Sequence, residues 1–196
     1  MPKITVYITT HNYGNYVDKA IQSVFQQTID DWELIVIDDG STDNTGEMLD
    51  RYREHPKIQI IEQENKGLNV TNNIALRLAA GKYIMRLDAD DYLDENILLI
   101  LSNILDTKPN VGLVYPDYYL VDQEEQILEI VRRRKIGEEV ELLDLPAHGA
   151  CTMIRKENLL EIGGYYEDFN RQDGYDLWIK FIQHHNPYNV NIPMFY

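Results

Sequence analysis

Short apolar runs alternate along the chain with longer segments whose apolar residues recur every three or four positions. The runs are rich in β-branched and aromatic residues and predict buried strands over 4–9, 33–38, 58–62 and 83–88. The segments that follow them have helical spacing and predict helices over 17–27, 45–53, 68–80 and 95–105. Such strand-then-helix units in succession predict an α/β domain with a mostly parallel central sheet, flanked by helices and joined by right-handed crossovers.

The second half of the chain has a less regular pattern. Further strands are predicted over 111–115, 126–132, 148–154 and 190–194, and further helices over 157–162 and 173–184. The charged segment 132–146 does not fit a core, so we expect an exposed loop there. A lid over a binding site is the alternative for that segment.

Polar residues follow each of the first four strands. The carboxyl ends of parallel strands meet at one edge of a sheet, where ligands bind. After the fourth strand stand Asp88, Asp90 and Asp91. In an extended backbone residues i and i+2 share a face, so Asp88 and Asp90 can converge on one Mn²⁺ or Mg²⁺ ion while Asp91 points elsewhere. This predicts a metal-assisted site for a phosphorylated ligand; a solvated loop that caps the next helix is the alternative.

Composition removes several classes of function. With 18 Lys and Arg against 33 Asp and Glu, the formal charge of −15 excludes a nucleic-acid surface. No glycine-rich dinucleotide or P-loop motif follows a strand. Cys151 is the single cysteine, and we expect it to be a buried, inert thiol in a reducing compartment. Without a run of about 20 apolar residues, we expect a cytoplasmic protein, with peripheral membrane contact left open.

A series of short segments, in their order and spacing, resembles the inverting nucleotide-sugar glycosyltransferases of family 2, which have the GT-A fold. The segments are Thr10-His11-Asn12, Gln27-Thr28, Asp38–Asp43, Asn65-Lys66-Gly67, Ala80–Ile84, Asp88–Asp91, Gly163-Gly164-Tyr165 and Asp173–Trp178. The resemblance implies one GT-A (Rossmann-like) domain over 1–196, with a nucleotide-binding half over about 1–115 and an acceptor-binding half over about 116–196. Relatives often continue beyond this point, so the resemblance also suggests a catalytic core truncated at its C-terminus.

The resemblance assigns roles to particular residues. The nucleotide-binding positions that it implies are Thr9, His11, Asn12, Asp39, Lys66, Asn72 and Asp88. Thr9, His11 and Asp39 would hold the base and ribose, with Asp39 accepting a hydrogen bond from the N3–H of a uracil. Asp90 would bind the divalent cation that bridges the phosphates, and Asp88 would lie beside it near the ribose. Such an ion stabilises the charge that develops on a leaving nucleoside diphosphate.

An inverting displacement also needs a base for the acceptor hydroxyl. The resemblance implies Asp173, at the start of the last helix, where the helix dipole keeps a carboxylate ionised. Asp176 is the fallback, because Gly174 adds one residue to the family's spacing. From the residues alone, an N-terminal cap is the alternative role for Asp173.

Four positions depart from the family pattern or resist assignment. Relatives often carry an aromatic residue at His11 and an Arg at Asn72, which leaves Lys66 or Arg86 as the cation near the phosphates. Arg86 falls on a buried strand, where an ion pair and a phosphate contact are both open. We expect His148 to be structural.

The pattern and the resemblance together predict a metal-dependent, inverting transfer of a hexosyl or N-acetylhexosaminyl group. The expected donor is a nucleotide-sugar with UDP, and the acceptor is a hydroxyl of a glycan or lipid-linked molecule in cell-surface polysaccharide or glycan synthesis. Two alternatives stay open, namely a sugar-1-phosphate nucleotidyltransferase and a nucleotide- or glycan-binding module without turnover.

Overall fold

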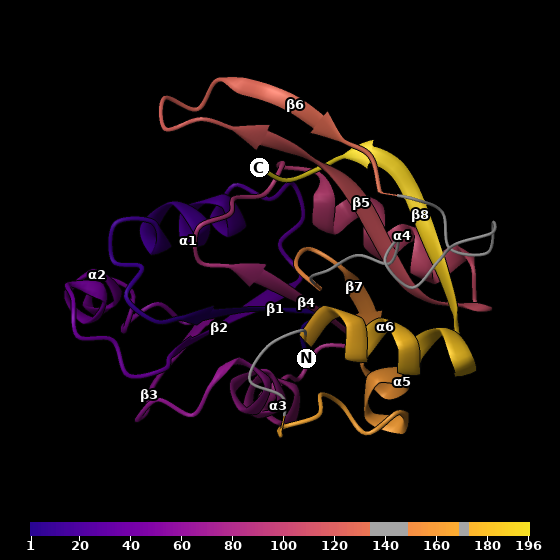
Figure 1. The fold of residues 1–196 in the computed structure, drawn as a ribbon, viewed down its shortest axis with the longest axis horizontal. Coiled ribbons are helices and arrows are strands. Elements are labelled where there is room, and N and C mark those ends of the chain that lie inside the picture. Colours follow the sequence, from indigo (N-terminus) through magenta and orange to yellow (C-terminus); the bar gives the residue numbers. More distant parts are fainter. Residues whose placement is uncertain (134–148, 169–172) are drawn as a thin grey trace.

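The computed structural model describes residues 1–133, 149–168 and 173–196. Four parallel strands form its first half in the order β3-β2-β1-β4, each strand but the last followed by the helix that leads to the next (Figure 1). The strands are β1 (Ile4–Thr10), β2 (Trp32–Asp38), β3 (Ile58–Glu62) and β4 (Tyr83–Asp88). The helices are α1 (Val17–Phe25), α2 (Thr45–Asp50) and α3 (Leu68–Leu78). The predicted parallel, doubly wound half is confirmed.

The sheet continues with strands of mixed direction. β7 (Met153–Arg155) pairs antiparallel with β4 and with β5 (Val111–Val121), which also pairs antiparallel with β6 (Ile127–Val131) and parallel with β8 (Asn186–Pro193). The helices of this half are α4 (Ile97–Thr107), α5 (Lys156–Glu161) and α6 (Asp173–His184). An α/β domain with a mostly parallel core sheet is confirmed.

The two faces of the sheet are covered by different helices. Ile4, Val6 and Ile8 of β1 pack into one core cluster with α1 and α4, whereas Tyr7 packs into a second cluster with α3, α5 and α6. Figure 1 shows these helices on opposite sides of the strands. Both faces of β1 are therefore dry, which explains its uninterrupted β-branched and aromatic composition.

Two of the sequence-based boundaries are corrected by the structure. The strand expected over 148–154 begins only at Met153, because Cys151 lies in a turn with a φ of 53°, which cannot continue a strand. Cys151 is nevertheless fully buried, as expected. β5 extends past the predicted end at residue 115, and its pairing with β8 shifts register between Tyr115 and Asp117. Pro116 lies at that shift and has no N–H to donate, which explains the irregularity.

The last helix and the charged segment before it are the remaining features of the second half. Leu177, Trp178 and Phe181 of α6 are buried, whereas Ile182 on the same helix is 37% exposed and does not belong to the core. The predicted loop over 132–146 falls largely outside the described residues, as does His148.

Candidate functional site

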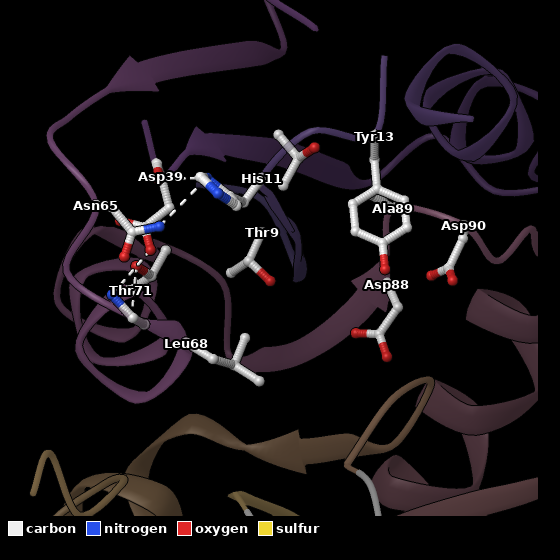
Figure 2. A pocket seen from close by; sticks show the side chains of 12 residues that line it. Thr9, His11, Tyr13, Asp39, Asn65, Leu68, Thr71, Asp88, Ala89 and Asp90 are labelled. Atoms are coloured by element: carbon white, nitrogen blue, oxygen red, sulfur yellow. Dashed lines mark hydrogen bonds between the residues drawn. The ribbon is translucent and has the colours of Figure 1, made fainter. Parts of the chain in front are cut away.

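A cavity of about 390 Å³ opens where the carboxyl ends of β1, β2 and β4 meet (Figure 2). Its walls come from the four loops that the sequence placed at this edge. The lining residues are Thr9, Thr10, His11, Tyr13, Asp39, Asn65, Gly67, Leu68, Thr71, Asp88, Ala89 and Asp90. Four residues predicted to hold a nucleotide, namely Thr9, His11, Asp39 and Asp88, therefore lie on one cavity together with the predicted metal ligand Asp90.

One end of the cavity is built around the carboxylate of Asp39. Its Oδ1 accepts hydrogen bonds from the Lys66 backbone N–H at 2.8 Å and from Gln63 Nε2 at 2.7 Å, and its Oδ2 accepts one from the Gly67 N–H at 2.9 Å. Gly67 has a φ of 86°, which glycine adopts without strain. A carboxylate offers about four acceptor positions. Asp39 thus has capacity for one further donor from a ligand.

The ring of His11 is fixed beside Asp39. Its Nδ1 lies 3.0 Å from the Asp39 carbonyl oxygen and 3.2 Å from Asn65 Nδ2, and its Nε2 lies 3.2 Å from Asn12 Nδ2. The imidazole is therefore held at the cavity wall, where its face can pack against a planar ligand.

Asn12 connects two loops and does not line the cavity. Its Oδ1 accepts hydrogen bonds from the backbone N–H groups of Thr42 at 2.7 Å and Asp43 at 3.3 Å, and its own N–H donates to Ser41 Oγ at 2.8 Å. Its φ of 63° is a conformation that asparagine tolerates better than most residues. A direct contact of Asn12 with a nucleotide stays a prediction; its visible role is to join the loops after β1 and β2.

The other end of the cavity is acidic. Arg86, which is 3% exposed, places Nε 2.8 Å from Asp88 Oδ1 and Nη2 3.3 Å from Asp88 Oδ2. Partial desolvation and then the charge of Asp88 raise the pKa of Asp90. Burial, followed by the charges of Asp88 and Asp90, raises the pKa of Asp91 to about 8. Asp91 is absent from the cavity lining, as the alternation of side chains predicted.

The acidic end fits a divalent cation. No described residue forms an ion pair with Asp90, whereas Asp88 is already paired with Arg86. The described residues hold no group of three or more His, Cys, Asp or Glu side chains suited to a metal. Mg²⁺ and Mn²⁺ are commonly held by only one or two carboxylates together with waters and substrate phosphates. Asp90, with Asp88 beside it, supplies that donor set.

The remaining predicted site residues are not part of the cavity lining. Lys66 is exposed and absent from the cavity lining, and its backbone N–H donates to Asp39. A contact of its side chain with a nucleotide stays a prediction. Asn72 is fully buried on α3, and its side-chain amide has no hydrogen-bond partner among the described residues. Asp173 and Asp176 lie on α6, as predicted, but their side chains belong to the part of the chain that the structure leaves undescribed.

Sequence reasoning missed several lining residues. Tyr13 follows the first polar loop, and Leu68 and Thr71 occupy the first turn of α3. The spacing of Leu68 and Thr71, three positions apart on a helix that begins at the ligand-binding edge, could have identified that pair. Tyr13 gives no comparable periodic signal.

Comparison with known proteins identifies the family. The family model described as "Glycosyl transferase family 2" matches residues 5–163, so the chain belongs to this family. A chondroitin synthase of Escherichia coli is 30% identical over 187 residues, which cover 92% of this chain and 26% of that protein. The chain thus spans about a quarter of the length of this relative.

Two solved structures share the fold. TarS of S. aureus, solved in complex with UDP, superposes with a TM-score of 0.81 at 17% identity and covers 99% of this chain and 60% of that chain. The mannosyltransferase PcManGT from Pyrobaculum calidifontis, in complex with GDP-Man and Mn²⁺, gives a TM-score of 0.74 at 21% identity over 98% of this chain and 56% of that one. The GT-A fold is confirmed. No helix in the described part of the chain is both long and apolar enough to cross a membrane.

Proposed function

We propose that this domain is a metal-dependent, inverting glycosyltransferase that moves a hexosyl or N-acetylhexosaminyl group from a UDP-linked donor to a hydroxyl acceptor. The acceptor would be a glycan or lipid-linked molecule in cell-surface polysaccharide or glycan synthesis. The reaction would take place in the cytoplasm, with peripheral contact at the membrane where the acceptor is lipid-linked.

The observation that supports this proposal is the difference between the two ends of the cavity. A carboxylate with one acceptor position left, Asp39, lies at one end, and the pair Asp88 and Asp90 lies at the other. A nucleoside diphosphate has the matching order of groups, with a base that can donate at one end and phosphates at the other. Uracil carries an N3–H donor for Asp39, and cytosine does not.

Asp90 and Asp88 would hold the divalent cation, which supplies Lewis-acid stabilisation of the leaving diphosphate. The protein's own part is to orient the nucleotide. Thr9 and His11 line the cavity beside Asp39, and Arg86 holds both oxygens of Asp88 in place. Asp173, or Asp176 as the fallback, would accept the proton from the acceptor hydroxyl.

The two alternatives make different predictions. A sugar-1-phosphate nucleotidyltransferase would release pyrophosphate from UTP and a sugar phosphate, and the match to family 2 speaks against it. A binding module without turnover would bind nucleotide but transfer no sugar. An assay for each product therefore separates these alternatives from glycosyl transfer.

The test is a calorimetric titration with UDP, GDP, CMP and dTDP, with and without Mn²⁺. We expect UDP to bind best and only with the metal, and Asp90→Ala to abolish the metal-dependent part. The control is Glu47→Ala, an exposed carboxylate of α2 that is absent from the cavity lining. Equal UDP binding without Mn²⁺ would remove the metal assignment, and tighter binding of GDP would remove the uracil role of Asp39.

A further inference from the structure

Tyr13 stands at the acidic end of the cavity, where no function has been assigned to it. It lines the cavity with Asp88 and Asp90, and Figure 2 shows its ring descending from the loop after β1 with the hydroxyl directed toward these carboxylates. The side chain is 39% exposed. The charge of Asp90 first, then partial burial and the charge of Asp88, raise the pKa of the Tyr13 hydroxyl.

The backbone around Tyr13 is held in place. Its carbonyl oxygen accepts hydrogen bonds from the N–H groups of Tyr16 at 2.9 Å and Val17 at 3.0 Å, at the start of α1. The N–H of Gly14 donates to Asp43 Oδ2 at 3.0 Å. A Cβ at Gly14 would lie 2.8 Å from the backbone nitrogen of Thr45, so the close approach of these loops requires glycine. The position of Tyr13 is thus preorganised.

The ring is also supported from one side. Tyr16 packs edge-on against it, with ring centroids 6.2 Å apart. Among the described residues, the Tyr13 hydroxyl has no hydrogen-bond partner, although it lies in a corner dominated by carboxylates. A phenol keeps its proton at neutral pH and can donate one hydrogen bond. A placed donor without a partner, at the end of a ligand cavity, is suited to a ligand oxygen.

The order of residues along the cavity indicates which ligand oxygen would accept a hydrogen bond from the Tyr13 hydroxyl. Figure 2 shows Asp39 on one side of the cavity, Asp88 farther across it and Asp90 beyond Asp88. A nucleotide with its base at Asp39 would therefore extend its phosphates past Asp88 toward Asp90. The Tyr13 hydroxyl lies at this far end of the cavity, beside Asp88 and Asp90. The distal phosphate of such a nucleotide would therefore be the group nearest to the hydroxyl.

We propose that Tyr13 determines the preference for diphosphates by donating a hydrogen bond from its hydroxyl to the distal phosphate of the donor nucleotide. This inference rests on the proposed function, because it assumes a nucleotide bound with its base at Asp39. The inference goes beyond the proposed function because it assigns recognition of the second phosphate to Tyr13, a neutral side chain, as well as to the metal.

The test is calorimetry of UMP and UDP, each with Mn²⁺, on the wild-type protein, Tyr13→Phe and Tyr16→Phe. Loss of one hydrogen bond to a charged group predicts about tenfold weaker UDP binding in Tyr13→Phe, with UMP binding unchanged. Tyr16→Phe is the matched control, since Tyr16 is 55% exposed on the same loop but absent from the cavity lining. Both variants keep the ring, so thermal unfolding should match that of the wild type.

Unchanged UDP binding in Tyr13→Phe would overturn the inference and leave the proposed function standing. Equal losses for UMP and UDP would also overturn it, because the hydroxyl would then act on the nucleoside end or on the loop. If the wild-type protein bound neither nucleotide, the proposed function itself would fall and this contact with it.

Discussion

At the residue scale, side chains that line the cavity also hold the surrounding loops together. Asp39 accepts three hydrogen bonds from the segment after β3 while lining the cavity. The sequence shows only an acidic turn after an apolar strand at this position. The three groups that donate hydrogen bonds to Asp39 belong to residues 63–67. These hydrogen bonds form because two loops far apart in sequence come together in the fold, and no local sequence pattern predicts that.

Arg86 forms the ion pair that was one of its two possible roles in the sequence. Burial of a guanidinium requires an anionic partner, and the structure supplies Asp88, two residues along the same strand. An ion pair at i and i+2 was within reach of sequence reasoning, because both side chains point to one face of β4. A phosphate contact of Arg86 stays a prediction.

The catalytic base is a residue-scale prediction. Asp173→Asn should lower sugar transfer by at least about 100-fold, the usual size of a general-base contribution, while leaving metal-dependent UDP binding intact. The measurement pairs a transfer assay with UDP calorimetry. Asp176→Asn is the matched comparison on the same helix. Full activity in Asp173→Asn with loss in Asp176→Asn would move the base to the fallback position.

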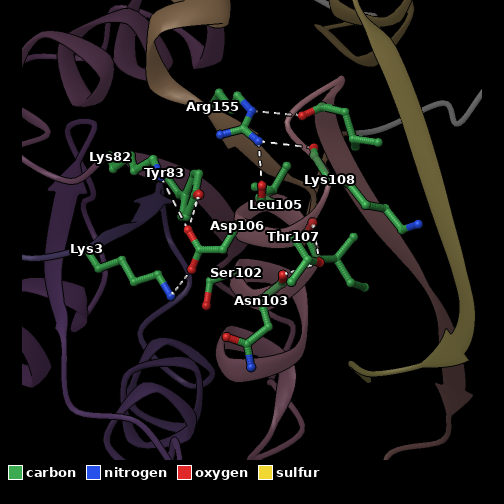
Figure 3. Close-up of polar contacts among 12 residues, drawn as sticks. Lys3, Lys82, Tyr83, Ser102, Asn103, Leu105, Asp106, Thr107, Lys108 and Arg155 are labelled. Atoms are coloured by element: carbon green, nitrogen blue, oxygen red, sulfur yellow. Dashed lines mark hydrogen bonds and ion pairs between the residues drawn. The ribbon is translucent and has the colours of Figure 1, made fainter.

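At the element scale, Figure 3 shows the hydrogen bonds that Arg155 makes at the C-terminal end of α4. The guanidinium of Arg155 donates to the carbonyl oxygens of Leu105 at 2.5 Å, Lys108 at 3.3 Å and Val111 at 2.8 Å. The last carbonyls of a helix have no partner within the helix, and a cation there also favours the helix dipole. Arg155 is the last residue of β7 and pairs with Tyr83 of β4, so this contact joins the helix to the sheet.

Asp106 of α4 gives a pH-dependent prediction. Its carboxylate lies 2.7 Å from Lys3 Nζ and accepts a hydrogen bond from the Tyr83 hydroxyl at 2.7 Å. These contacts, Lys3 first, lower the pKa of Asp106 from 3.8 to about 2. A lowered pKa in the folded state stabilises the protein above the ordinary pKa and loses this effect as pH falls toward the lowered one.

Asp106→Asn should therefore reduce the free energy of unfolding by about 1 kcal/mol at pH 7, a value limited by solvent screening. The side chain is 38% exposed, which accounts for that screening. Urea unfolding at pH 7, 4, 3 and 2 should show the difference from wild type shrinking below pH 4. Glu64→Gln, an exposed carboxylate for which no side-chain contact is described, is the control. A difference that stays constant down to pH 2 would contradict the assigned ion pairs.

At the scale of the whole molecule, the parallel half could be predicted because each strand and helix has a distinct period. Because the strands are parallel, the loops after them lie at the same edge of the sheet. This is enough to predict that Asp39 and Asp88 lie at one cavity. The mixed half could not be predicted as well. Its strands pair across long separations, as β4 does with β7, and the turn at Cys151 depends on a backbone bond from its N–H to the Arg86 carbonyl at 2.7 Å.

One long-range contact of this kind reaches the site. Tyr92, next to the acidic loop, exchanges two backbone hydrogen bonds with Tyr196, at 3.0 and 2.9 Å. The Tyr196 ring stacks on Tyr92 with centroids 4.6 Å apart and on Tyr119 of β5 with centroids 4.7 Å apart. The segment at 194–196 therefore connects the loop that carries Asp90 to the mixed half of the sheet.

Tyr196→Ala removes both ring contacts, so the loop after β4 should open more often. We expect faster hydrogen exchange at the Tyr92 and Asp94 amides, which donate to carbonyls of Tyr196 and Met194, and several-fold weaker Mn²⁺-dependent UDP binding. Tyr188→Ala, on β8 and 37% exposed, should change neither. Tyr196→Phe should behave as wild type, because stacking needs the ring and the hydroxyl makes no described hydrogen bond. Faster exchange with unchanged UDP affinity would show that the acidic loop keeps its shape without this contact.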